Sequence, residues 1–497
     1  MSKPSSITVI GAGFAGLSAA SLLAKAGHEV TIIEKNDQTG GRCRVWQKDG
    51  FTFDMGPSWY WMPDVFEQYY ALFGKSVEDF YKLVRLDPSY RVYFGEDDYV
   101  DVPANMGELE ALFESIEPGS SLKLREFLRQ AAYKYEVGMR DYVFRPSHSI
   151  FEFFDLHLVR ESFRIQMFTS MSKHVRQYFR NPRLIKILEF PVLFLGATPQ
   201  NTPALYSLMN HADLTLGTWY PMGGMHKISQ AMTAIAREQG VRIELNTEAL
   251  RISAQQGRAS HVHTNRGDFR TDFVIANADY RHADQELLDL PDRNYSSAYW
   301  DSRTMSPSSL LFYIGTDRPL QGLLHHTLFF DEDFDLHAKE IYTTPKWPTK
   351  PLFYVSATSK TDHSAAPDQH ENIFILIPLA PGLEDREELR EQYYHLVMDR
   401  LERLTGQAIR PHVILKRSYA MRDFEQDYHS FRGNAYGLAN TLLQTAFFKP
   451  KLKSRKLSNL YYTGQLTVPG PGVPPSLISG QVVAREIEKE LMNGRGR

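Results

Sequence analysis

The sequence predicts an α/β protein in which a discontinuous, Rossmann-like dinucleotide-binding domain carries an inserted α+β domain. Three observations support this prediction. A glycine-rich turn joins a short strand to a helix near the start of the chain, and an uncharged strand–loop–helix unit lies near its end. The 497 residues are also too many for one hydrophobic core and suit two or three domains.

Composition excludes some classes of protein. The chain is 42 % hydrophobic and 23 % charged, which is ordinary for a globular protein. Its net charge of −3 gives no reason to expect nucleic acid as a partner, which would favour a basic stripe. The single cysteine, Cys43, cannot form an intramolecular disulfide. This fits a reducing compartment, although an exported protein without disulfides would look the same.

Neither a signal peptide nor a membrane span is evident in the sequence. The N-terminal apolar stretch is broken by glycines and is followed by no cleavage pattern. The most apolar uncharged run, residues 190–200, has about half of the ~20 residues that a span requires. We therefore expect a cytoplasmic protein that is attached to the cell membrane peripherally.

A strand–turn–helix–strand unit opens the chain. Residues 7–10 are a β-branched strand, and residues 17–27 an Ala/Leu-rich helix with Gly27 as its cap. Residues 29–34 form a second strand that ends at Glu34. The turn between the first strand and the helix reads G-A-G-F-A-G, residues 11–16. This context makes the glycine pattern a strong signal for a bound dinucleotide, against the alternative of a glycine-rich turn without a ligand.

Each residue of the motif has an expected task. Gly11 allows the tight turn, Gly13 lets the backbone approach a pyrophosphate, and Gly16 lets the helix sit close to the strand. Glu34 lies where a carboxylate accepts hydrogen bonds from an adenosine ribose. We expect three neighbouring residues to line the same site: Phe14, Ala15 and Lys35.

The following segment indicates which dinucleotide is bound. Gly40, Gly41 and Arg42 add a second loop of close approach and a fixed cation for the diphosphate. The segment GFTFDMGPSW then gives a strand and a tight turn at Gly56 and Pro57. This series resembles the opening of the flavin-containing amine oxidase and phytoene desaturase superfamily. The resemblance implies that the cofactor is FAD rather than NAD.

The chain returns to this fold after a long insertion. Residues 219–252 read as a turn, an amphipathic helix and a strand, and residues 273–279 as a strand and a polar turn. In the family, the backbone at the position of Ala249 reaches the adenine end of the cofactor. Asp279 either lies beneath the cofactor or caps the structure that follows.

The domain boundaries follow from these segments. We expect an FAD-binding domain from residues 1–70, 215–290 and 450–497. The intervening residues, 71–214 and 291–449, hold most of the aromatic side chains. They are expected to form one discontinuous α+β domain that binds the substrate and faces the membrane.

The C-terminal unit contains no charged residue from Tyr461 to Gln481. A strand at residues 460–463 ends at Gly464, and Ser476 is placed to cap the last helix. Prolines fix the loop, glycines let it pass close to a flat ring, and the helix N-terminus stabilises negative charge on a reduced flavin. We expect the cofactor to contact Gly464, Gln465, Val473 and Pro474. The alternative is a rigid surface turn.

Three segments carry a more specific resemblance: NLYYTGQLTVPGPGVPPSLISGQVVAREI, FDMGPSWYWMPDVFE and TWYPMGGM. They resemble bacterial carotenoid desaturases, in particular phytoene desaturases of the Bacteroidetes type, and the likeness extends from residue 7 to about 487. One departure concerns Gln465 to Val468, where many members have Ala-Gly-Thr-His. In amine oxidases a carboxylate often holds the ribityl chain at the position of Gln465; an amide can donate and accept there instead.

The resemblance implies FAD-dependent desaturation of a C40 carotene, phytoene towards lycopene, by hydride transfer to flavin N5 and proton loss. An allylic cation is stabilised by conjugation, so positioning matters more than a strong base. We assign no catalytic base and no metal site. Asp54 is as well explained by a structural role, and the pair His325 and His326 lacks further ligand spacing.

Aromatic and basic residues suggest how a polyene is reached. Five aromatic residues either line a channel or are ordinary packing: Trp59, Tyr60, Trp61, Trp219 and Tyr220. Residues 446–456, AFFKPKLKSRK, suit an anionic lipid surface or are a solvated loop. Because only one dinucleotide motif is present, oxygen or a membrane quinone is expected to accept the electrons.

Three alternatives remain open from the sequence. One is a related desaturase or isomerase acting on another polyene, such as a hydroxylated carotene. Another is an amine or porphyrinogen oxidase, which would favour a smaller pocket and often a lysine near the flavin. The last is a lipid-binding escort protein without redox chemistry, which would not need to keep the phosphate-binding glycines.

Overall fold

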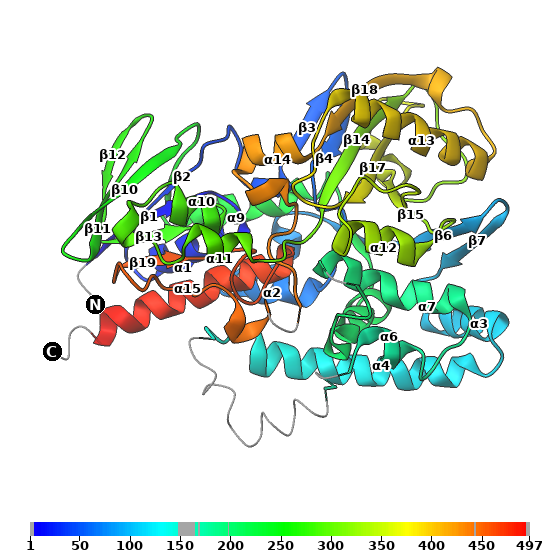
Figure 1. Cartoon of the computed structure of the whole chain (residues 1–497), viewed down its shortest axis with the longest axis horizontal. Coiled ribbons are helices and arrows are strands. Elements are labelled where there is room, and N and C mark those ends of the chain that lie inside the picture. Colours follow the sequence, from blue (N-terminus) through cyan, green and yellow to red (C-terminus); the bar gives the residue numbers. More distant parts are fainter. Residues whose placement is uncertain (1–3, 148–164, 167–168, 197, 442–443, 494–497) are drawn as a thin grey trace.

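The computed structural model of the chain describes residues 4–147, 165–166, 169–196, 198–441 and 444–493. Figure 1 shows a parallel sheet with its helices on the left, a second, larger sheet on the upper right, and a group of helices below the second sheet. In the described part of the chain, no helix is long and apolar enough to cross a bilayer.

The first sheet has five strands in the order β19-β13-β1-β2-β9, and every pair is parallel. The strands are β1 (Ser6–Ile10), β2 (Glu29–Ile33), β9 (Arg242–Glu244), β13 (Phe273–Ala276) and β19 (Leu460–Tyr462). A parallel sheet is buried on both faces, which explains why β1 and β13 are almost uniformly apolar. Strands far apart in the sequence therefore meet at one edge.

Three helices pack beside this sheet: α1 (Phe14–Lys25), α9 (His226–Glu238) and α15 (Val473–Asn493). The contact between α1 and α15 is especially close. A Cβ on Gly480 would lie 2.2 Å from the carbonyl oxygen of Ala15, and a Cβ on Gly16 would lie 2.3 Å from that of Gly11. Only glycine fits at either position, so the two ends of the chain are locked together beside β1.

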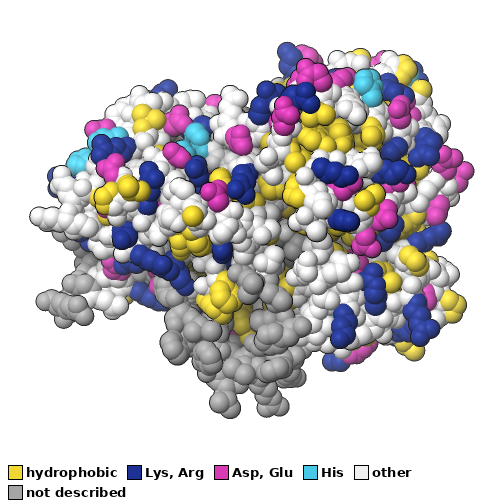
Figure 2. All heavy atoms as spheres, in the orientation of Figure 1, with side chains coloured by type: hydrophobic (Ala, Val, Ile, Leu, Met, Phe, Trp, Pro, Cys, Tyr) yellow, Lys and Arg dark blue, Asp and Glu magenta, His cyan; other side chains and the backbone are white. Residues whose placement is uncertain are grey.

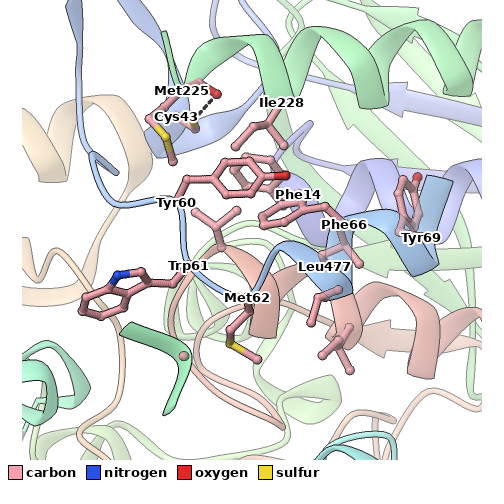
Figure 3. Packing of buried hydrophobic residues seen from close by; sticks show 14 of the residues in the cluster. Phe14, Cys43, Tyr60, Trp61, Met62, Phe66, Tyr69, Met225, Ile228 and Leu477 are labelled. Carbon is pink, nitrogen blue, oxygen red and sulfur yellow. Dashed lines mark hydrogen bonds between the residues drawn. The ribbon is translucent and has the colours of Figure 1, made fainter. Parts of the chain in front are cut away.

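A continuous apolar core joins these helices to the rest of the molecule (Figure 3). Phe14 of α1, Ile228 of α9 and Leu477 of α15 are buried in it, together with Tyr60 and Phe66. Phe66 lies on α2 (Pro63–Ala71). The side chain of Phe14 thus belongs to the core, and a contact of this residue with a cofactor would involve its backbone.

The second sheet has seven strands in the order β18-β14-β17-β16-β15-β6-β7. Its strands are β6 (Tyr90–Gly95), β7 (Asp98–Val102), β14 (Ser308–Thr316), β15 (His326–Phe329), β16 (Phe353–Ser356), β17 (Glu371–Leu379) and β18 (Val413–Tyr419). β6 and β15 are parallel, and the other neighbours are antiparallel. Apolar residues of α13 (Glu387–Thr405) pack against it, and α12 (Phe334–Tyr342) follows β15.

Smaller elements connect these parts. The further strands are β3 (Val45–Lys48), β4 (Phe51–Asp54), β5 (Leu83–Arg85), β8 (Trp219–Pro221), β10 (Ala249–Gln255), β11 (Arg258–Thr264) and β12 (Gly267–Arg270). The further helices are α3 (Met106–Ile116), α4 (Ser120–Val137), α6 (Met171–Val175), α7 (Pro182–Glu189), α8 (Leu208–Asn210), α10 (Tyr280–Gln285), α11 (Ser297–Asp301) and α14 (Met421–Tyr428).

The expected α/β architecture is confirmed. The five parallel strands come from the three segments predicted to build the cofactor domain, and the seven-stranded sheet draws on both insertions. The domain limits themselves stay a prediction. Within the first insertion, residues 148–164, 167–168 and 197 lie outside the described part.

One detail of the C-terminal helix was predicted wrongly. It begins at Val473, so Ser476 lies inside the first turn and is not its N-cap. Pro474 and Pro475 have no N–H, which removes two of the donors that an N-cap side chain would otherwise satisfy. Proline at the start of the helix does the work that was expected of the serine.

Candidate functional site

Three glycine loops meet at the end of strand β1. Gly41 packs on Gly13, because a Cβ on Gly41 would lie 3.4 Å from the Gly13 Cα atom. Gly56 packs on the next residue of the same loop, since its Cβ would lie 2.6 Å from the carbonyl oxygen of Arg42. Residues that are more than forty positions apart in the sequence therefore form one surface of exposed backbone groups.

Asn277, which follows β13, ties this surface to the C-terminal loop. Its side-chain amide donates to the Gly11 carbonyl oxygen at 2.9 Å. A Cβ on Gly464 would lie 3.2 Å from the Asn277 Oδ1 atom, and a Cβ on Gly13 would lie 3.2 Å from its Nδ2 atom. One side chain thus fixes the distance between the first glycine loop and the last one, a role that the sequence did not assign to it.

Glu34 is held in place by backbone amides. Its carboxylate accepts from the N–H of Ala12 at 2.8 Å and from that of Asn36 at 2.9 Å. Thr247 N–H donates to the Glu34 carbonyl oxygen at 2.8 Å, which brings the start of β10, with Ala249, alongside. The acidic residue expected for a ribose is therefore rigid and 5 % exposed, directly beside the first glycine loop.

A segment that sequence reasoning missed covers the cations beside Glu34. Lys35 Nζ donates to the Gln426 carbonyl oxygen at 2.6 Å. Arg42 donates to the hydroxyl of Ser430, and its guanidinium carbon lies 4.9 Å from the centre of the Tyr428 ring. These partners lie on α14 and the residues after it, far away in the sequence, and no local pattern marks them.

The charge-free loop is placed against these elements. Ser479 of α15 hydrogen-bonds Thr463, Thr467 and the Gly464 amide, which fixes the loop from the helix side. The side chain of Gln465 points to Gly437, whose Cβ would lie 2.9 Å from its Cγ atom. With two prolines after it, Val473 is the first residue of α15 that offers a backbone N–H.

Several buried donors have no hydrogen-bond partner among the described residues, and three of them lie at this site: Arg42 Nε, Gln465 Nε2 and Lys449 Nζ. The amine of Lys449 lies 3.5 Å from where a Cβ on Gly470 would be, so it faces the C-terminal loop. Buried donors are normally satisfied. A diphosphate for Arg42 and a polyol chain for Gln465 would satisfy them, so the residues present fit a flavin dinucleotide.

An apolar cavity lies in the other half of the molecule. Its walls come from β14 to β17, from α12 and from residues 190–193. The residues that line it are Phe190, Leu193, Pro307, Ser309, Leu328, Phe330, Phe334, His337, Ala338, Ile341, Tyr342, Leu352, Phe353, Tyr354, Leu376, Pro378 and Tyr436.

Two contacts connect the cavity to the cofactor loops. The hydroxyl oxygen of Tyr354 lies 3.0 Å from Ser58 Oγ, directly after the Gly56–Pro57 turn. Tyr436 also lines the cavity, and it precedes Gly437, which packs against Gln465. One end of an apolar chamber therefore adjoins both loops that were expected to hold a flavin.

Asp54 and Asp279 each had two possible roles from the sequence. Asp54 accepts from the amides of Met225 and His226 at the start of α9, and Asp279 accepts from that of His282 at the start of α10. Both act as structural caps. In the described part of the chain no cluster of three or more His, Cys, Asp or Glu side chains could hold a metal ion.

Of the aromatic residues that the sequence suggested for a channel, Trp59 lies next to the cavity and Tyr60 lies in the core. Trp59 packs against the cavity residues Phe190 and Tyr354, with ring centres 5.9 and 5.6 Å apart. Tyr60 is fully buried, its hydroxyl 3.1 Å from that of Tyr81. None of the five lines the cavity, but Trp59 supports its wall.

The fold and the site together define a flavin-dependent oxidoreductase. The chain belongs to the family of flavin containing amine oxidoreductases, whose family model matches residues 14–488. Its cofactor is therefore FAD. The recognition made from the glycine loops and the C-terminal signature is confirmed.

Individual relatives extend this result. Carotenoid 3,4-desaturase of Haloarcula japonica is 41 % identical over 487 residues, 98 % of each chain. The 4,4'-diapophytoene desaturase (4,4'-diaponeurosporene-forming) of Staphylococcus aureus is 33 % identical and covers 98 % of this chain and 99 % of that one. An oxidoreductase of Methanosarcina mazei has the same fold, with a TM-score of 0.64 at 17 % identity over 97 % of this chain and 100 % of that one.

Proposed function

We propose that this protein is an FAD-dependent carotenoid desaturase. The single observation that carries the proposal is the apolar cavity that ends beside Ser58 and Tyr436, next to the glycine loops. A polyene has no charge to be recognised, so a chamber lined by aromatic and aliphatic side chains suits it. The two carotenoid desaturases among the relatives support the same substrate class.

The chain's own residues would divide the work as follows. Glu34, Arg42 and Gln465 hold and orient the cofactor, which supplies the oxidant for the hydride that leaves the substrate. The cavity walls hold the polyene in one orientation and exclude water, so that a cationic intermediate on the substrate is not hydrated. Val473 N–H, at the start of α15, stabilises negative charge at the edge of the cofactor.

Two substrates follow from different observations. The sequence resemblance favours phytoene, desaturated towards lycopene. The relative from Haloarcula japonica favours instead the introduction of a 3,4 double bond into a carotenoid. Both reactions remove two hydrogens from a saturated carbon pair next to a conjugated system, so the same site serves either.

Access from a lipid surface is part of the proposal. Of the five basic residues in 446–456, Lys449 is buried and Lys453 is paired with Glu490, whereas Arg455 and Lys456 are exposed. Phe448 is 46 % exposed. A membrane contact would therefore depend on a smaller set of residues than the sequence indicated. Over the face shown in Figure 2, Lys and Arg side chains are interspersed with Asp and Glu.

A product assay tests the proposal and separates its two substrates. Purified, FAD-loaded protein is mixed under air with liposomes that contain phytoene or a coloured carotenoid with a saturated 3,4 bond. We expect red-shifted polyene bands that require FAD, with oxygen or an added quinone as the electron acceptor. Products from the second substrate alone would reassign the reaction to 3,4-desaturation. Unchanged polyenes in every mixture would contradict the proposal.

A further inference from the structure

A chain of hydrogen bonds leads away from the cavity at the end nearest the cofactor loops. Tyr354, on the cavity wall, is within hydrogen-bond distance of two groups: its hydroxyl lies 3.0 Å from Ser58 Oγ and 2.6 Å from Nδ1 of His326. His326 is fully buried. Tyr354 is also buried, and it lines the cavity. The three residues come from β15, β16 and the turn after Gly56, so the fold brings them together.

The desaturation needs a proton acceptor that the cavity wall otherwise lacks. One hydrogen leaves the substrate as hydride, and the other must leave as a proton. No Asp, Glu or Lys is among the lining residues. His337 is on the wall, but its Nε2 lies 3.0 Å from the Pro378 carbonyl oxygen and its Nδ1 accepts from Leu352 N–H at 3.0 Å. Both of its ring nitrogens are therefore engaged.

We propose that Tyr354 and His326 form the proton-accepting pair of the reaction, an inference that rests on the proposed carotenoid desaturation. The C–H bond next to the cationic carbon breaks, and its electron pair forms the new double bond. The proton goes to the Tyr354 oxygen while the phenolic proton of Tyr354 passes to Nδ1 of His326. Tyr354 is the catalytic residue, and His326 acts through it.

The surroundings of His326 suit a brief protonation. The indole of Trp59 stacks on the imidazole with ring centres 4.0 Å apart and planes 11° from parallel. An aromatic face stabilises a cation placed over it, so Trp59 favours the protonated ring. Burial lowers the pKa of His326 well below its ordinary value. The ring therefore passes the proton on instead of storing it, and an allylic cation is acidic enough to give it up.

A second buried histidine, His325, lies beside His326. The rings of His325 and His326 lie 4.5 Å apart, and Nε2 of each is buried with no hydrogen-bond partner among the described residues. Nδ1 of His325 is 2.7 Å from the Thr361 hydroxyl. The pair that the sequence showed to lack the spacing of metal ligands thus lies behind the cavity wall, with both Nε2 atoms open.

The test compares two tyrosines on the same wall. Tyr354→Phe removes the hydroxyl of the pair. Tyr342→Phe removes a hydroxyl whose hydrogen-bond partner among the described residues is the Leu193 carbonyl oxygen at 3.5 Å. FAD-loaded protein is mixed without oxygen with a carotenoid that the wild type oxidises. The absorbance of the new polyene is followed in H2O and D2O, because the new double bond forms only when the proton leaves. We expect Tyr354→Phe to slow the reaction about 100-fold and to abolish the solvent isotope effect, and Tyr342→Phe to change the rate less than about threefold.

His326→Phe is a second variant that keeps the stack on Trp59, and it should behave like Tyr354→Phe. FAD content and the absorbance shift of bound carotenoid are measured for each variant. A Tyr354→Phe or His326→Phe protein that binds both molecules and reacts within threefold of the wild-type rate, with its isotope effect intact, would overturn the inference. A wild-type protein that no carotenoid reduces would instead remove the proposed function, and this pair with it.

Discussion

The two halves of the molecule solve opposite problems. In the cofactor half, buried polar groups are left open: Arg42, Gln465 and Lys449 each have a donor without a partner among the described residues. In the cavity half, the polar atoms of the lining residue His337 are closed off by backbone partners, and what remains is an apolar space. The difference teaches that the first half is built to receive a polar molecule and the second a hydrophobic one.

The largest effect is expected at the contact of the two chain ends. Alanine at Gly480 would place its Cβ 2.2 Å from the Ala15 carbonyl oxygen. In a helix interior, Gly→Ala normally stabilises by about 1 kcal/mol, but here overpacking should cost a net ~3 kcal/mol. Gly480→Ala should lower the free energy of unfolding in urea and the FAD content. Carotenoid binding in the cavity should decrease only in proportion to the fraction of protein that is unfolded.

Gly95→Ala is the matched control, because its Cβ would lie 3.7 Å from the Asp98 Cβ, an ordinary contact, at a φ that alanine accepts. Its free energy of unfolding should stay within about 1 kcal/mol of the wild-type value. If Gly480→Ala were as stable as Gly95→Ala, the close crossing of α1 and α15 would be wrong.

The next largest effect is expected at Lys449, the buried amine of the cofactor half that has no hydrogen-bond partner among the described residues. Burial lowers the pKa of Lys449 to about 7 from 10.5. The unfolded chain therefore binds this proton more tightly, and the contribution of Lys449 to stability falls as the pH drops from about 10 to about 7 and stays low below that. Lys449→Met should stabilise the FAD-free protein by about 2–4 kcal/mol at pH 6 and by less at pH 9.

A second buried lysine sharpens this test. Lys134 has a pKa that burial also lowers to about 7, but its amine has contacts with Gln166, His174, the Ala204 carbonyl oxygen and Ser207 at 3.0–3.2 Å. Lys134→Met should destabilise by about 1–3 kcal/mol, because it leaves those partners unsatisfied. If both variants changed the free energy of unfolding equally, the Lys449 amine would not differ from Lys134 in lacking hydrogen-bond partners.

The cavity half is tested by filling it. Ala338 lines the cavity on α12, and Ala338→Phe should lower carotenoid turnover at least tenfold while FAD content and the flavin spectrum stay unchanged. Ala111→Phe, on the exposed face of α3, is the control for an added phenyl ring. Undiminished turnover by Ala338→Phe would mean that the substrate binds elsewhere.

The smallest expected effect is at Gln465. Gln465→Leu removes one unpaired donor from the cofactor half, and losing a single neutral hydrogen bond should raise the FAD dissociation constant about three- to tenfold. Fluorescence titration with FAD measures it. Gln255→Leu, at an exposed position, should leave the constant unchanged. A tighter complex for Gln465→Leu would indicate that the amide does not contact the cofactor.

The two halves also differ in how far the sequence predicted them. Gly11, Gly13, Gly16 and Glu34 act through a backbone geometry that is set within a few residues, so their positions were predicted from local order. The start of α15 was displaced by four residues, because consecutive prolines can begin a helix without a side-chain cap.

The rest depends on contacts between distant segments. Ser430 meets Arg42 across 388 positions, and Tyr354 meets Ser58 across 296. No period or motif in the sequence marks such pairs, since their partners are chosen by the packing of two sheets. The cavity, and the position of the histidine pair behind its wall, therefore emerged only from the structure.

The account is tested most directly by reducing the bound flavin with the substrate itself. FAD-loaded protein is mixed without oxygen with liposomes that contain phytoene or a carotenoid with a saturated 3,4 bond, and the visible absorbance of oxidised flavin is followed with the polyene spectrum. We predict that the flavin band bleaches as one new double bond forms per FAD. A flavin that dithionite reduces but that neither carotenoid bleaches would contradict the assignment of the cavity to a carotenoid.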